Sequence, residues 1–182
     1  MLVETQEFIK RAMSLYRSRG YASVKVSSGE LMMLVLSDIS RVVDIYSGDD
    51  VRSRLDLSAD YVGGDGGRSD YARDTMLCDA LADVAIRLYL SAGIFNVYFC
   101  KYISELDMHK EYGEMNSNGG LSFLEKSFIL CSIVCQLLAV EGNGVPAAIV
   151  GSALSFLECW CEDMGIDLPF YVERRLSLLE SK

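Results

Sequence analysis

Apolar side chains recur at helical spacing along most of the chain, and a glycine follows most of these stretches. A glycine in the left-handed conformation commonly ends a helix, so each stretch with its glycine predicts a helix and its end. Three such pairs lie in the first half: residues 5–19 before Gly20, 30–47 before Gly48, and 69–92 before Gly93. Two more follow in the second half: residues 122–141 before Gly142, and 146–164 before Gly165.

Two further stretches complete the helical pattern. Residues 96–106 are rich in aromatic side chains and predict a fourth helix, and residues 169–180 predict the last one. Both prolines, Pro146 and Pro169, stand at the start of a predicted helix, where a missing N–H is tolerated. The pattern as a whole predicts an all-α helical bundle.

The segments between these helices are polar and predict connections. Residues 21–29 predict a connector or a short hairpin, and residues 107–120 divide the chain into two parts. Residues 49–70 contain five residues of which four are glycine, at positions 63–67. We expect this segment to be a mobile loop that acts as a lid over a site between the flanking helices.

The two parts of the chain resemble each other weakly. Without gaps, residues 34–48 align with 128–142, and Gly93-Ile94 aligns with Gly165-Ile166. The alignment suggests pseudo-repeats over residues 5–106 and 121–182, packed about a pseudo-twofold axis. The alternative is that any two amphipathic helix pairs that end in glycine align this well.

Length and composition favour a single intracellular domain. The chain has 182 residues, 51% of them hydrophobic, which suffices for one core within a domain spanning residues 1–182. The longest apolar stretch, residues 127–140, is shorter than the roughly 20 residues that cross a bilayer. The first residues lack the basic and apolar regions of a signal peptide. We therefore expect a soluble, cytoplasmic protein with no membrane partner.

Charge and cysteine usage narrow the function further. The net charge of −9 repels a phosphate backbone, so no nucleic acid partner is expected. Six cysteines lie in apolar helical stretches, which is typical of small buried hydrophobes in a reducing compartment. Cys159 and Cys161 point to nearly opposite helix faces, which argues against a zinc site.

Candidate chemistry lies on two of the predicted helices. Asp38, Arg41 and Asp44 follow one another at a spacing of three, and Asp79 and Asp83 are four apart on a second helix. Such spacings place side chains on one helix face. Carboxylates on two facing helices can hold Mg²⁺, which bridges phosphates and lowers the pKa of an attacking water.

These two helices resemble the signature helices of the MazG-like, all-α nucleoside triphosphate pyrophosphohydrolases. The first helix of that family carries Glu-x-x-Glu after an apolar run like residues 31–37, and the second carries Glu-x-x-Asp followed by Ile-Arg. This chain matches at Asp38, Asp83 and the pair Ile86-Arg87. It departs at Arg41 and Ala80, which take the places of the other two carboxylates.

The resemblance, which covers about residues 8–103, implies a MazG-like bundle and three alternative functions. The first is a catalytically degenerate member that binds a nucleotide or a protein partner. The second is an active enzyme that cleaves a nucleoside triphosphate to the monophosphate and pyrophosphate, with Mg²⁺ on Asp38 and Asp83 and completed by Asp79 or Asp44. Arg41 and Arg87 would then contact phosphates. The third is a structural subunit of a larger assembly, and family members commonly form homo-oligomers.

Arg41 favours the degenerate reading. Two unit charges about 4 Å apart interact by about 4 kcal/mol at an effective dielectric constant of about 20, so a guanidinium strongly opposes a divalent ion beside it. Arg41 can instead bridge Asp38, Asp44 or Asp83 and replace the ion. The same row of charges is also compatible with an ordinary salt-bridge ladder on a helix surface.

Overall fold

The computed structural model describes residues 2–20, 27–54, 66–95, 112–115, 120–136 and 145–181. Within these residues the chain is all-helical and contains no strand, as the sequence predicts. Beside a single helical turn at residues 112–115, the helices are α1 (Leu2–Ser18), α2 (Ser28–Arg54), α3 (Gly66–Ile94), α6 (Phe123–Cys135), α7 (Val145–Asp163) and α8 (Leu168–Glu180). In this part of the chain, no helix is both long enough and apolar enough to span a membrane.

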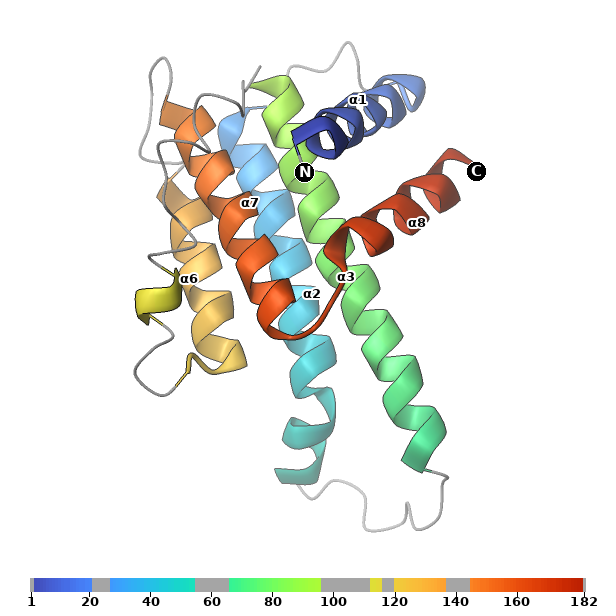
Figure 1. The fold of residues 1–182 in the computed structure, drawn as a ribbon, viewed down its shortest axis with the longest axis vertical. Helices are drawn as coiled ribbons and strands as arrows, with labels where there is room; N and C mark the ends of the chain where they lie inside the picture. The colour runs from blue at the N-terminus through green and yellow to red at the C-terminus, as the bar shows by residue number, and fades with distance from the viewer. Residues whose placement is uncertain are drawn as a thin grey trace.

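The long helices α2 and α3 run antiparallel and form the central pair of the bundle (Figure 1). Helices α6 and α7 lie along one side of this pair, and α1 and α8 cross α3 on the other side. Helix α3 contacts α1, α2, α7 and α8, so it is the central element. The N- and C-terminal helices, α1 and α8, also contact each other.

The core is built mainly from α3 and α7, which are apolar on most of their circumference. In α3, nearly every residue from 80 to 92 is buried, because its small and branched side chains face neighbours in several directions. In α7, Phe156 and Trp160 are fully buried. The ring of Phe123, the first residue of α6, meets Trp160 edge to face with centroids 4.9 Å apart.

Several helix ends lie where the sequence predicts them. Gly20 and Gly165 have φ angles of 82° and 69°, so each takes the left-handed conformation after its helix. Pro146 and Pro169 lie in the first turns of α7 and α8. Helix α6 begins with a capping box, in which the Ser122 side chain accepts from the Glu125 N–H and the Glu125 carboxylate accepts from the Ser122 N–H.

The predicted end of the second helix at Gly48 is wrong. Helix α2 continues to Arg54, and α3 begins at Gly66, so the predicted loop over residues 49–70 is helical at both ends. Gly48 lies inside α2, and a glycine inside a helix costs only about 1 kcal/mol, which helix pairing can offset. The proposed lid, residues 55–65, lies outside the described residues.

The third helix ends at Ile94, two residues past its predicted last residue, but Gly93 is not the left-handed cap that the pattern predicts. Its place there has a packing reason. Helix α1 crosses α3 here, and a Cβ atom on Gly93 would lie 2.7 Å from Met13 Sδ and 3.3 Å from Ile9 Cγ2. A residue with a side chain at this position would force the Met13 side chain to move.

We expect Gly93→Ala to lower the free energy of unfolding by about 1–2 kcal/mol, because the added methyl overpacks the α1–α3 contact. Gly151→Ala is the matched control. Gly151 also lies inside a helix, but nothing lies within 4 Å of a Cβ built there, so the higher helix propensity of alanine should stabilise by about 0.5–1 kcal/mol. Urea unfolding followed by circular dichroism measures both. Equal effects of the two substitutions would contradict the close approach.

Some expectations fall wholly or partly outside the described residues. These are the aromatic helix at 96–106, most of the polar divide at 107–120, and the predicted end of the 122–141 helix at Gly142, since α6 is described to Cys135. The pseudo-repeat stays a prediction. The expectation of buried cysteines holds for Cys78, Cys159 and Cys161, whereas Cys131 is partly buried and Cys135 is exposed.

Candidate functional site

A cleft of about 320 Å³ opens where α1, α2, α3 and α8 meet. Its apolar walls come mainly from α1 and α3, and its polar side chains come from all four helices. The polar lining consists of Tyr16, Arg19, Asp38, Arg41, Asp83, Arg87 and Arg175. Four of the six residues that the sequence singles out therefore line one cleft.

Helical spacing explains why these side chains converge. Asp83 and Arg87 are one turn apart on the one face of α3 that is not fully buried. Asp38 and Arg41, three residues apart on α2, face them. Tyr16 in the last turn of α1 and Arg19 directly after the helix line the cleft as well.

Asp83 is the hub of the polar network. Arg175 of α8 makes a bidentate contact with it: Nε donates to Oδ1 at 2.7 Å and Nη2 donates to Oδ2 at 2.9 Å. Arg41 of α2 donates from Nη1 to Oδ2 at 3.2 Å. Of the three partners considered for Arg41, the structure shows Asp83, across the helix pair.

A second ion pair joins the same two helices, with the arginine now on α3 and the aspartate on α2. Arg87 of α3 donates from Nε to Asp38 Oδ2 of α2 at 3.1 Å. Burial raises the pKa of the Asp38 carboxyl above its ordinary value, while the charge and hydrogen bond of Arg87 oppose this shift. The two carboxylates of the predicted metal site thus each have at least one arginine partner.

The other two predicted metal ligands lie elsewhere. Asp44 is exposed on α2 and does not line the cleft. Asp79 lies one turn before Asp83 on α3, where Arg174 approaches it at 3.8 Å. The Oδ1 atom of Asp79 is buried and has no hydrogen-bond partner within the described part of the chain. The structure therefore brings Asp38 and Asp83 together and leaves Asp44 and Asp79 out of the cleft.

The donor set does not match what a metal ion needs. Among the described residues, no three or more histidine, cysteine, aspartate or glutamate side chains form a group that could hold a metal ion. A Mg²⁺ ion between Asp38 and Asp83 would also lie beside three guanidinium groups, which repel it. The residues present fit a guanidinium-balanced site better than a metal site.

The cleft carries excess positive charge in a protein that is negative overall. Four guanidinium groups, of Arg19, Arg41, Arg87 and Arg175, face two carboxylates. The Arg41 and Arg87 side chains are 53% and 41% exposed, against 20% for Asp38 and 16% for Asp83. The two acids are therefore more buried than Arg41 and Arg87, whose side chains are partly open to solvent.

A second, larger hollow of about 850 Å³ continues from the cleft. The two share Tyr16, Arg19, Arg87 and Leu90. The far part of the second hollow is mostly apolar and is formed by the first turns of α2, where Met33 and Leu34 are 61% and 41% exposed. Glu30, the one acid among the described residues that line it, accepts hydrogen bonds from the Ser27 N–H and hydroxyl and so caps α2.

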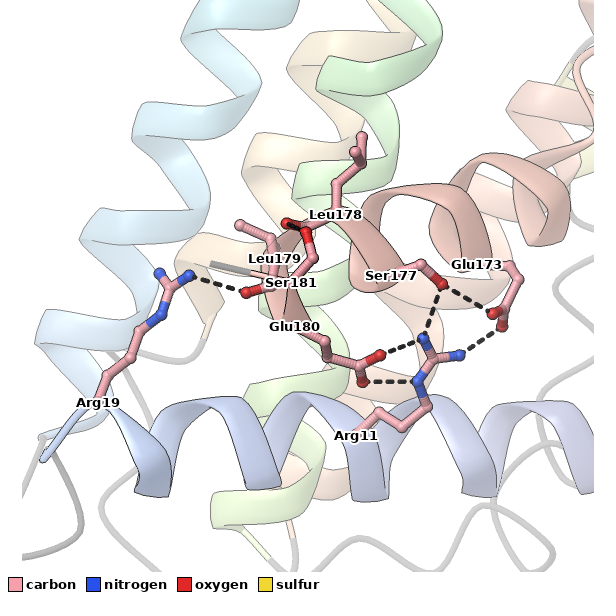
Figure 2. A network of polar contacts seen from close by, with 8 residues as sticks. All are labelled: Arg11, Arg19, Glu173, Ser177, Leu178, Leu179, Glu180 and Ser181. Carbon is pink, nitrogen blue, oxygen red and sulfur yellow. Dashed lines mark hydrogen bonds and ion pairs between the residues drawn. The ribbon is translucent and has the colours of Figure 1, made fainter.

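A separate polar network holds α1 against α8 and so fixes two walls of the cleft (Figure 2). Arg11 of α1 donates to both carboxylate oxygens of Glu180 at 2.8 Å and to Glu173 Oε2 at 2.5 Å. It also donates to the Ser177 hydroxyl at 3.2 Å. Near the mouth, Arg19 Nη2 donates to the Leu179 carbonyl at 3.5 Å.

Local sequence patterns do not single out Arg175, Arg174 or Arg19. Arg175 is 92 residues from Asp83 along the chain, and no local spacing connects them. One signal was present: Arg175 lies three residues after Val172 and seven after Leu168, both buried in the apolar stripe of α8. A charged residue on the apolar face of a helix needs a buried partner.

Comparison with known proteins gives no relative for this chain. No family model matches it, and no curated protein and no solved structure matches it. The function of the cleft is therefore argued from its chemistry.

Proposed function

We propose that this protein is a catalytically degenerate MazG-like bundle that binds a nucleotide by its phosphate group in the arginine-lined cleft. One observation carries the proposal: Asp38 and Asp83, the two carboxylates left from the family pattern, are each paired with an arginine that lines the cleft and stays about half exposed, Arg87 and Arg41. Arginine takes the place that a metal ion would hold and offers its remaining donors to a phosphate.

The exposed arginines have donors to spare. A guanidinium carries five N–H donors. Within the described residues, Arg41 donates only from Nη1 and Arg87 only from Nε to protein partners. The planar arrangement of the remaining donors suits phosphate oxygens, and each charged hydrogen bond contributes about 1.5–3 kcal/mol.

The active-enzyme alternative requires Mg²⁺ at Asp38 and Asp83. Mg²⁺ can be held by one or two carboxylates when waters and phosphates complete its shell. Here, however, the ion would first have to displace Arg175 from a two-pronged contact with Asp83, and Arg87 from Asp38. Because of this competition, we propose a nucleotide-binding function rather than hydrolysis.

The structural-subunit alternative rests on a different surface. On α6, the Leu124 and Phe128 side chains lie one turn apart and are 55% and 73% exposed. An exposed apolar pair of this kind is compatible with contact to a protein partner or a second copy of the chain. It says nothing about the cleft, so the two functions can coexist.

The test is a calorimetric titration of the protein with nucleoside mono-, di- and triphosphates, using Arg41→Ala and Arg87→Ala. We expect each substitution to weaken binding about tenfold or more, because each removes a charged hydrogen bond to phosphate. Arg17→Ala is the matched control: Arg17 is an exposed arginine on α1 that does not line the cleft.

Two results would refute this function. The first is no binding of any nucleotide, or equal loss of binding in the cleft variants and in Arg17→Ala. The second is Mg²⁺-dependent release of pyrophosphate from a nucleoside triphosphate that disappears in Asp83→Asn, which would establish the enzyme instead.

A further inference from the structure

We infer that the cleft and the adjoining hollow together select a nucleoside monophosphate, a dianionic phosphate monoester attached to a ring system, and bind it without a divalent cation. The inference rests on the proposed function and narrows it to one ligand class. It follows from the charge of the cleft, from the shape of the joined cavities, and from the state of the two carboxylates.

Charge limits the number of phosphates. Four guanidinium groups against Asp38 and Asp83 leave two positive charges in excess. A phosphate monoester carries between about −1.5 and −2 at pH 7, which this excess balances. A free triphosphate carries more negative charge than the cleft compensates, and its additional phosphates would approach the two carboxylates. The cleft therefore favours one phosphate over three.

The shape and polarity of the two joined cavities favour a ligand with a ring system beside its phosphate. The two cavities meet at Tyr16, Arg19, Arg87 and Leu90. A phosphate held by the arginines at this junction leaves its ester group facing the larger hollow, where Met33 and Leu34 provide an apolar floor. Tyr16 lines both cavities and can lie against a flat ring.

The carboxylates explain why no cation is needed. A nucleoside triphosphate usually enters a site as its magnesium complex, and the ion needs open carboxylate oxygens. Both oxygens of Asp83 already accept from Arg175, and Oδ2 accepts from Arg41 as well. Asp38 accepts from Arg87. The arginines thus supply both the positive charge and the donors that the ion would otherwise supply.

The experiment is calorimetry in EDTA, with four ligands that separate the parts of the inference. We expect a nucleoside monophosphate to bind at least tenfold more tightly than the corresponding triphosphate, and at least tenfold more tightly than inorganic phosphate. Ribose 5-phosphate, which carries the phosphate without the base, should bind about as weakly as inorganic phosphate. Replacing EDTA by Mg²⁺ should change the affinity for the monophosphate less than twofold.

Two variants test the larger hollow. Met33→Ser removes part of its apolar floor at an exposed position, and should weaken the nucleoside monophosphate several-fold while leaving inorganic phosphate unchanged. Met76→Ser is the matched control, because Met76 is 54% exposed on α3 and lines neither cavity. It should change neither affinity.

The outcomes separate this inference from the proposed function. Tighter binding of a triphosphate, or binding that requires Mg²⁺, would overturn the inference and leave nucleotide binding in place. Equal binding of monophosphate, ribose 5-phosphate and inorganic phosphate, with no effect of Met33→Ser, would overturn the role of the larger hollow. No binding of any of the four ligands would refute the proposed function itself.

Discussion

Trp160→Ala should lower the free energy of unfolding by about 3–5 kcal/mol, the range for removing a large buried ring. Trp160 is fully buried in α7, and its ring meets Phe123 at the α6–α7 contact. The substitution leaves a cavity between two helices, because the surrounding backbone can only partly collapse into it. Since Trp160 is the single tryptophan of the chain, unfolding has to be followed by circular dichroism.

Trp160→Phe is the control for this prediction. The Trp160 indole N–H has no hydrogen-bond partner among the described residues, so replacing it by a smaller ring loses packing and no hydrogen bond. We expect a loss of about 1–2 kcal/mol. If the two substitutions proved equally costly, the cavity would not be the cause.

Asp83→Asn should act on stability and on binding in opposite directions. It removes the charge that Arg175 and Arg41 share, and because the arginines are 25% and 53% exposed, the loss of stability is moderate, about 1–3 kcal/mol. At the same time it raises the excess positive charge of the cleft. A unit negative charge a few ångströms from a bound dianion costs more than about 1.4 kcal/mol at an effective dielectric constant of about 20, so phosphate should bind at least tenfold more tightly.

Asp44→Asn serves as the matched control, because Asp44 is an exposed aspartate of α2 that does not line the cleft. We expect it to change neither thermal stability nor phosphate affinity measurably. Phosphate binding that weakens in Asp83→Asn would contradict the arginine-lined anion site, and would point back to Asp83 as a ligand of a cation.

The helices could be predicted from the sequence because the signals that specify them, apolar spacing and end residues, lie within a few residues of one another. An apolar stripe with a glycine after it correctly marks the ends at Gly20 and Gly165, where the glycine is left-handed. The same signal fails at Gly48, inside α2, and at Gly93 it marks the end of α3 to within one residue but not the conformation of the glycine. At Gly93 the reason is a neighbouring helix, and the identity of that neighbour is not encoded within a few residues of the glycine.

The site was predicted in part for the same reason. Local helical spacing singles out Asp38 with Arg41 and Asp79 with Asp83, and the resemblance to the MazG-like signature helices adds Arg87. Arg175 completes the network from the far end of the chain. Its role depends on α8 crossing α3, a tertiary arrangement that helical periodicity does not specify.

The Arg11 network makes the geometry of the cleft sensitive to ionic strength. Its acidic partners, Glu173 and Glu180, are 54% and 39% exposed, and dissolved ions weaken charge pairs that are open to water. This network joins α1 and α8, and the cleft is lined by Arg175 of α8 and by Arg19, which directly follows α1. Dissolved salt thus acts on the site in two ways. It screens the attraction between an incoming anion and the arginines, and it weakens the Arg11 ion pairs that hold α1 and α8 at a fixed distance.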